Sequence, residues 1–277
     1  MPDYYRPTEV AMALNHIARA GLSILAGGTD YYAARVGRPL DEPILDITAI
    51  EGLRGIETAA DHWRIGAGTT WTGLLETPLP PVFDGLKLAA REIGGVQIQN
   101  SGTLAGNLCN ASPAADGVPA LLALDASVEL ASTRGARILT LAQFILGPRK
   151  TARRADELLT AILVPKPQFE ARSHFLKLGA RKYLVISITM ASVVIEHEGG
   201  IVRAARVAVG ACSPVATRLP ALEAALLGQR MNARLPEVAI AAHLSPLAPI
   251  DDVRASAEYR LDSALTVIKR TIAGACA

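Results

Sequence analysis

Two glycine-bearing segments constrain this chain more than any other feature. The first is 25–30 (Leu-Ala-Gly-Gly-Thr-Asp), which follows a strand-like run, so Gly27–Gly28 must form a tight turn. The second is 101–108 (Ser-Gly-Thr-Leu-Ala-Gly-Asn-Leu), within a long stretch of small and polar residues. Glycine lets a ligand approach the backbone closely, and successive free N–H groups can bind an anion without a charged side chain. Two such segments could hold a pyrophosphate from two sides.

Each segment alone is weak evidence, because a pair of glycines after a strand is usually only a turn. The first segment lacks the Lys-Ser/Thr ending of a P-loop and the spacing of a GxGxxG fingerprint. Gly66-Ala67-Gly68 begins that spacing, but Trp71 replaces the last glycine, and we interpret the segment as a strand end. The five histidines show no HExxH spacing and the chain has no GxSxG motif, so no catalytic constellation is evident.

The three cysteines predict no metal site. Cys109, Cys212 and Cys276 are too far apart for CxxC pairs, so we expect no iron–sulfur cluster in this chain. A sparse, odd cysteine count and the absence of a signal-peptide pattern predict a cytoplasmic protein. The longest nearly apolar run, 183–195, is too short for a membrane span. A net charge of +2 and 4% aromatic residues argue against nucleic-acid binding, and we read the small arginine clusters near 149–154 as a solvated surface.

Local patterns predict an α+β protein with two domains. Pro165 and Pro167 interrupt the chain, and the pattern of predicted helices and strands changes after them. We therefore place a boundary near Pro167 and expect domains at 1–167 and 168–277. Before the boundary the patterns predict a helix at 8–20 and several short strands. After it they predict strands at 174–178, 186–196 and 202–210, then helices at 220–227, 236–244 and 252–272.

Taken in order, four segments resemble the FAD-binding subunit of the xanthine dehydrogenase, carbon monoxide dehydrogenase and 4-hydroxybenzoyl-CoA reductase family. They are 25–30, 65–70 (Ile-Gly-Ala-Gly-Thr-Thr), 100–116 (NSGTLAGNLCNASPAAD) and 175–181 (Phe-Leu-Lys-Leu-Gly-Ala-Arg). The resemblance covers essentially the whole chain. It implies a two-part N-terminal FAD-binding domain of the PCMH type, followed by a smaller C-terminal domain with an antiparallel sheet and helices.

The resemblance also implies a set of cofactor contacts and no catalytic or metal-binding residue. The FAD pyrophosphate would lie between the two glycine segments, Asp116 would bind the nucleotide part, Leu159 would pack beside the flavin and Lys177 would approach its edge. Two alternatives stay open: Lys177 as a solvated strand lysine, and Asp116 as the N-cap of a helix at 118–124. The implied contacts are Ile24, Leu25, Ala26, Gly27, Gly28, Thr29, Asp30, Tyr31, Ser101, Gly102, Thr103, Leu104, Ala105, Gly106, Asn107, Asp116, Leu159 and Lys177.

One residue departs from the family pattern. Ala105 stands where the family usually has glycine, which is acceptable only if its φ is negative.

The implied function is electron transfer in a molybdenum hydroxylase. Partner subunits would carry molybdopterin and [2Fe-2S] clusters, and FAD would pass their electrons to an external acceptor, in a heterotrimer or a dimer of heterotrimers. Two alternatives are a stand-alone FAD-dependent oxidase or reductase, for which the C-terminal residues are few, and a nucleotide-binding regulatory or scaffold module.

Overall fold

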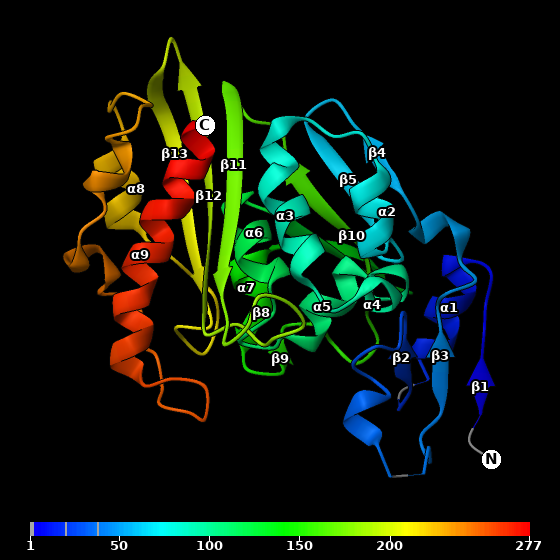
Figure 1. Ribbon diagram of the computed structural model, residues 1–277. Coiled ribbons are helices and arrows are strands. Elements are labelled where there is room, and N and C mark those ends of the chain that lie inside the picture. Colours follow the sequence, from blue (N-terminus) through cyan, green and yellow to red (C-terminus); the bar gives the residue numbers. More distant parts are fainter. Residues whose placement is uncertain (1–2, 20, 38) are drawn as a thin grey trace.

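The computed structural model describes residues 3–19, 21–37 and 39–277, and they form three lobes in a row (Figure 1). We use N-terminal lobe for the described part of residues 3–53, central lobe for residues 54–167 and C-terminal lobe for residues 168–277. Helices and mainly antiparallel sheets alternate along the chain, which confirms the predicted α+β class. No helix in these described ranges is both long and apolar enough to cross a bilayer.

The N-terminal lobe is a small parallel sheet with one helix. The strands β1 (Tyr4–Tyr5) and β2 (Ser23–Leu25) both pair with β3 (Ile44–Asp46). Helix α1 (Val10–Ile17) contributes to the lobe's core through Ala13 and Ile17, which share an apolar cluster with Leu45. The helix is shorter than the predicted 8–20, and Ala20 lies outside the described residues. Short 3-10 turns η1 (Ala33–Arg35) and η2 (Glu51–Leu53) complete the lobe.

The central lobe is built on a five-stranded antiparallel sheet in the order β4-β5-β10-β6-β7, with a separate β8-β9 hairpin. Helices connect the strands, and all of them except α4 bury residues in the same apolar core. The strands are β4 (Ile56–Thr58), β5 (His62–Gly66), β6 (Ser127–Ser132), β7 (Gly135–Thr140), β8 (Ile145–Gly147), β9 (Lys150–Thr151) and β10 (Leu158–Pro165). The helices are α2 (Trp71–Glu76), η3 (Pro81–Phe83), α3 (Asp84–Glu92), α4 (Val96–Ser101), α5 (Leu104–Asn110), α6 (Gly117–Ala123) and α7 (Leu141–Phe144).

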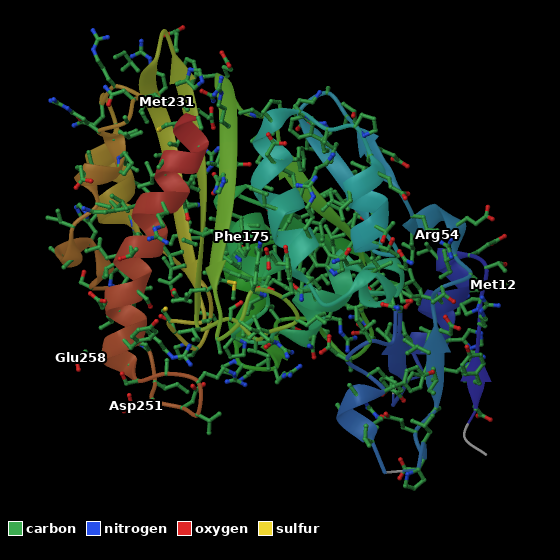
Figure 2. All side chains as sticks on the ribbon, viewed as in Figure 1. Met12, Arg54, Phe175, Met231, Asp251 and Glu258 are labelled. Atoms are coloured by element: carbon green, nitrogen blue, oxygen red, sulfur yellow. The ribbon has the colours of Figure 1, made fainter. Side chains whose placement is uncertain are left out.

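The C-terminal lobe is a four-stranded antiparallel sheet, β11 (Glu170–Leu178), β12 (Thr189–Glu198), β13 (Ile201–Gly210) and β14 (Thr217–Arg218). Because side chains alternate along a strand, its two faces join different cores. Val193 and Ile195 share a cluster with α8 (Pro220–Leu226) and α9 (Ala257–Cys276), while Val194 joins the core of the central lobe. Phe175 is also buried in that central core, between the two lobes (Figure 2).

Two predictions about elements were wrong, and two helices were not predicted. The long stretch of small and polar residues at 97–116 contains most of α4 and all of α5, because six- and seven-residue helices are too short to show a helical period. The predicted helix at 236–244 is two 3-10 turns, η4 (Leu235–Val238) and η5 (Ala241–Leu244). The last helix begins at Ala257 and not at 252, since Asp252 accepts backbone N–H bonds from Arg254 and Ala255 and closes a turn.

Candidate cofactor site

A cavity of about 510 Å³ lies between the N-terminal and central lobes, within the roughly 300–1,000 Å³ of small-molecule and cofactor sites. Both glycine segments border it, although they belong to different lobes. Among the described residues, none of the C-terminal lobe lines the cavity. The lining residues are Leu22, Ser23, Ile24, Ala26, Gly27, Gly28, Thr29, Asp30, Tyr31, Ala34, Arg35, Ile47, Ala67, Trp71, Ile93, Ile98, Gly102, Thr103, Ala105, Gly106, Asn107, Cys109, Asn110, Arg149, Thr151, Arg153, Leu158 and Leu159.

The first glycine segment presents unpaired backbone donors. It leaves β2 through a turn in which Gly28 has φ +71°, a conformation that favours glycine. In the described part of the chain, the backbone N–H groups from Gly27 to Asp30 donate no hydrogen bond. Consecutive free N–H groups in a turn form a site for an anion such as a phosphate.

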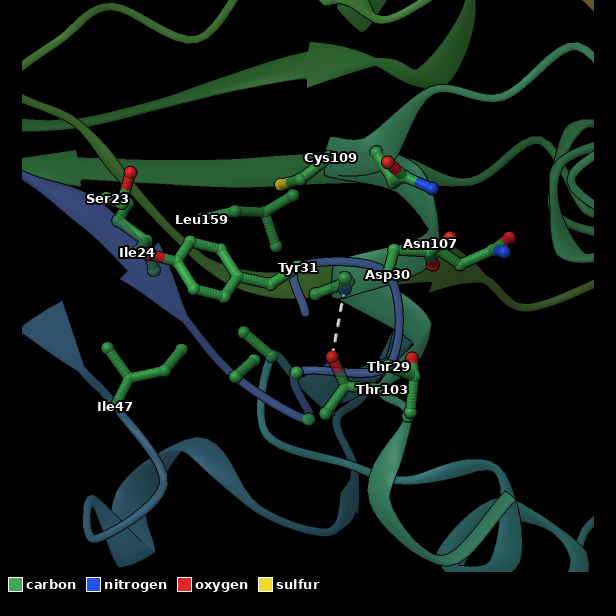
Figure 3. A pocket seen from close by; sticks show the side chains of 18 of the residues that line it. Ser23, Ile24, Thr29, Asp30, Tyr31, Ile47, Thr103, Asn107, Cys109 and Leu159 are labelled. Atoms are coloured by element: carbon green, nitrogen blue, oxygen red, sulfur yellow. Dashed lines mark hydrogen bonds between the residues drawn. The ribbon is translucent and has the colours of Figure 1, made fainter. Parts of the chain in front are cut away.

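The second glycine segment meets the first through its backbone. A Cβ atom on Gly27 would lie only 1.9 Å from the carbonyl oxygen of Ser101, so the two segments can touch only because residue 27 has no side chain. Thr103 is the N-cap of α5, and its hydroxyl accepts the N–H of Gly106 at 2.9 Å, the bond drawn in Figure 3. The Oδ1 atom of Asn107, a cavity-lining residue, is buried and has no hydrogen-bond partner in the described chain.

Ala105 fits its place in the second segment. It lies in the first turn of α5 and is not among the residues with positive φ. The departure from the family pattern therefore introduces no backbone strain.

Apolar side chains and one tyrosine form the wall beyond the glycine turns. Ile24, Tyr31, Ile47 and Leu159 face the same space in Figure 3. The Tyr31 hydroxyl donates to Glu42 at 2.9 Å, which fixes the ring at the cavity. Apolar and aromatic side chains of this kind can pack against an aromatic ligand.

The cations along the cavity differ in their partners. Arg35 stacks on Tyr31, with 3.8 Å from its Cζ atom to the ring centroid, and is paired with Glu42. A hydrogen bond from Ser23, together with Tyr31 and Arg35, lowers the pKa of Glu42, so this carboxylate stays ionised near neutral pH. Arg149 donates to Asn110, and Arg153 donates to the carbonyl oxygens of Arg154 and Glu157. Both also line the cavity, although the sequence favours a solvated surface for their cluster.

Cys109 faces the cavity from α5 but is not an activated thiol. Cys109 is exposed at the cavity, and desolvation by the surrounding protein raises the pKa of its thiol to about 11, so the thiol stays neutral at pH 7. No cluster of histidine, cysteine, aspartate or glutamate that could hold a metal ion occurs in residues 3–19, 21–37 and 39–277.

Five of the expected cofactor contacts lie outside the cavity lining. Leu25 and Leu104 are buried in the cores of their lobes, and Ser101 contributes the carbonyl that touches Gly27. Asp116 and Lys177 form an ion pair of 2.8 Å with each other. Asp116 does stand at the N-cap position of α6, but its side chain makes no capping bond there, and Lys177 is only 5% exposed, so neither alternative role describes the geometry.

Fifteen lining residues were not among the expected contacts, and they include Ile47, Ile93, Ile98, Arg149 and Arg153. The basic cluster was the only local signal among them. The isoleucines are ordinary apolar residues in sequence, and only the packing of the lobes brings them to the cavity.

Comparisons with known proteins agree across the whole chain. A family model described as "FAD binding domain in molybdopterin dehydrogenase" matches residues 1–167, and one described as "CO dehydrogenase flavoprotein C-terminal domain" matches residues 174–275. The chain is 32% identical to the xanthine dehydrogenase FAD-binding subunit of Escherichia coli O157:H7, covering 99% of this chain and 96% of that protein.

Carbon monoxide dehydrogenases provide a second group of relatives. The medium chain from Afipia carboxidovorans is 31% identical over 98% of this chain and 95% of its own length. A chain in the structure of reconstituted CO dehydrogenase from Oligotropha carboxidovorans superposes with a TM-score of 0.90 at 28% identity, covering 100% of this chain and 98% of that one.

Proposed function

This chain belongs to the family of FAD-binding subunits of molybdenum hydroxylases, and from that membership we propose that it binds one FAD, noncovalently, between its N-terminal and central lobes. It is an electron-transfer component of an oxidoreductase. The relatives that match it over nearly their full length are themselves subunits or medium chains, so a stand-alone oxidase is not supported.

The observation that carries the cofactor site is the contact between the two glycine segments. Free N–H groups from Gly27 to Asp30 and the capped first turn of α5 face one cavity, where they would bind the two phosphates. Ile24, Tyr31 and Leu159 would pack against the ring systems.

Bound FAD would supply the redox chemistry, since a flavin can exchange electrons singly with clusters and in pairs with an acceptor. The chain itself binds and orients the cofactor and excludes water from one side of it. No acid or base on this chain is required for that role.

We propose partners that complete the electron path. The relatives are medium or FAD-binding subunits of multi-subunit dehydrogenases, and this chain is accordingly a component of a larger enzyme. A small subunit with [2Fe-2S] clusters would deliver electrons to FAD, and a large molybdopterin subunit would oxidise the substrate. We propose a heterotrimer, or a dimer of heterotrimers, located in the cytoplasm. The substrates in the relatives' names differ, which supports a shared flavin subunit beside a substrate-specific one.

The test is to purify the chain with its partner subunits and to identify the flavin. Denaturation should release about one FAD per chain, and phosphodiesterase should convert it to FMN. A complex with no flavin, or with FMN alone, would contradict the proposal. Substrate should bleach the flavin in the complex and leave it unchanged in the isolated subunit, whose metal content should include neither iron nor molybdenum.

A further inference from the structure

Segment 65–70, the second of the four family motifs, has no role in the proposed site so far. It begins at the end of β5, and Ala67 and Trp71 in and beside it line the cavity. Thr69, by contrast, is 4% exposed and lies outside the lining. A residue placed in this way can affect a cofactor only through the elements that it holds in position.

On one side, segment 65–70 bonds to the connection between the N-terminal and central lobes. The N–H of Gly68 donates to the carbonyl oxygen of Leu53 at 2.6 Å. The carbonyl oxygen of Gly55 accepts both the N–H of Gly66 at 3.0 Å and the hydroxyl of Thr69 at 2.9 Å. Leu53 is buried in the core of the N-terminal lobe, so these bonds attach that lobe to the central one.

The connection itself is short and turns at a glycine. Arg54 and Gly55 are the two residues between η2 and β4, and Arg54 is exposed where the two lobes join (Figure 2). Gly55 has φ +85° and no atom within 4 Å of the place of a Cβ, so no side chain restricts its backbone. The bonds from segment 65–70 therefore help to fix the direction in which the chain leaves the N-terminal lobe.

On the other side, the same segment bonds to the second glycine segment. The carbonyl oxygen of Thr69 accepts the N–H of Leu104, the first residue of α5, at 3.2 Å. Thr70 and Thr103 form an isolated antiparallel bridge beside this bond. Thr69 thus holds the connection of the lobes with its hydroxyl and the start of α5 with its carbonyl.

We propose that Thr69 is a positioning residue for the cofactor, because it sets the spacing between the two glycine segments. The first segment belongs to the N-terminal lobe, and the second lies at the start of α5. Loss of the hydroxyl would let the two lobes separate more often without removing any group that lines the cavity. The effect on the cofactor rests on the proposed FAD site, whereas the effect on the connection does not.

The test compares Thr69→Val, which removes the hydroxyl, with Thr69→Ser, which keeps it, in the full chain. Trypsin cleavage after Arg54 is followed without flavin by mass spectrometry, with cleavage after the exposed Lys182 as an internal reference. FAD affinity is measured by quenching of flavin fluorescence. We expect Thr69→Val to be cleaved after Arg54 about tenfold faster and to bind FAD about three- to tenfold more weakly, because one buried hydrogen bond is lost. Thr69→Ser should stay near the wild type in both measurements.

The matched control is Thr271→Val in α9. Thr271 is 1% exposed and its hydroxyl donates to the carbonyl oxygen of Val267 at 2.7 Å, so the same substitution removes a buried hydroxyl in the C-terminal lobe. It should lower the melting temperature by a similar amount and leave cleavage after Arg54 and FAD affinity unchanged. In the wild type, saturating FAD should slow cleavage after Arg54, since a ligand held by both lobes favours the closed connection.

Gly68→Ala tests the same contact if Thr69→Val does not fold. Its Cβ would lie 3.1 Å from the carbonyl oxygen of Leu53, so the connection must shift by a few tenths of an ångström and should be cleaved faster, by a smaller factor.

Two results in Thr69→Val would overturn the proposal: wild-type cleavage after Arg54, or faster cleavage with unchanged FAD affinity. Equal effects in Thr271→Val would show general destabilisation and would overturn it as well. A wild-type chain that binds no FAD would refute the cofactor site, and the cleavage rates would still decide whether Thr69 holds the connection.

Discussion

The two glycine segments border one cavity, yet each requires glycine for a different reason. In the first, Gly27 makes room for the backbone of Ser101 and Gly28 adopts a positive φ. In the second, the chain enters a helix whose cap is the hydroxyl of Thr103, and Gly106 leaves space for that hydroxyl. The first segment therefore depends on backbone conformation and close backbone contact. The second depends on a side chain that caps a helix.

This difference implies unequal sensitivity to substitution. A clash with another backbone cannot be relieved without moving a lobe, whereas a clash with a hydroxyl can be relieved by rotating it. Substitutions in the first segment should consequently reduce FAD affinity more than equivalent substitutions in the second.

Gly27→Ala should have the largest effect. Its Cβ would overlap the Ser101 carbonyl, so the N-terminal and central lobes must separate at the cavity. Overpacking of this kind costs about 3 kcal/mol, which corresponds to about a 100-fold loss of FAD affinity in a titration. Gly52→Ala is the control, because Gly52 lies in the same lobe as Gly27 and a Cβ there would meet no atom within 4 Å. Wild-type affinity in Gly27→Ala would show that the segments need not touch.

Gly28→Ala should have the next largest effect. Alanine at φ +71° costs about 1–2 kcal/mol, and the ring of Tyr32 must also move aside, so we expect about tenfold weaker FAD binding. Gly199→Ala in the β12-β13 hairpin has a similar φ of +58° and open space around it. It should lose similar stability in thermal unfolding and bind FAD normally. Equal affinity losses in both variants would indicate a global effect.

Gly106→Ala should be milder. Its Cβ would lie 2.9 Å from the Thr103 hydroxyl, so the capping bond is lost at about 1 kcal/mol and FAD affinity falls a few-fold. Thr103→Ala removes the same bond, and the double variant should cost less than the sum of the two in unfolding free energy. If the two losses in unfolding free energy were strictly additive, Gly106 would act by some route other than the capping bond.

Ala105→Gly should have the smallest effect, although it restores the usual family residue. Ala105 is helical, so glycine there would lower the free energy of unfolding by about 0.5–1 kcal/mol without strengthening FAD binding. Chemical denaturation and flavin titration would measure both. Tighter binding in this variant would show that the segment changes conformation around the cofactor.

Much of this architecture was predictable because its signals are local. The apolar runs of β12 and β13, the Gly199-Gly200 hairpin and the turn at Gly27–Gly28 are all encoded within a few residues. The order of four motifs also indicated the family. Short elements such as α4 and α5 could not be predicted, since one or two helical turns leave no period in the sequence.

The sequence by itself determined the turns, the apolar faces and the two segments that can present free N–H groups. Only the tertiary structure decided that Gly27 touches Ser101, that Arg149 and Arg153 line the same cavity, and that Lys177 is paired with Asp116. The physical reason is distance along the chain. Local rules fix the backbone angle φ and the face of an element to which each side chain points. Contacts between remote segments follow instead from how the three lobes pack. That packing depends on buried surface contributed by the whole molecule.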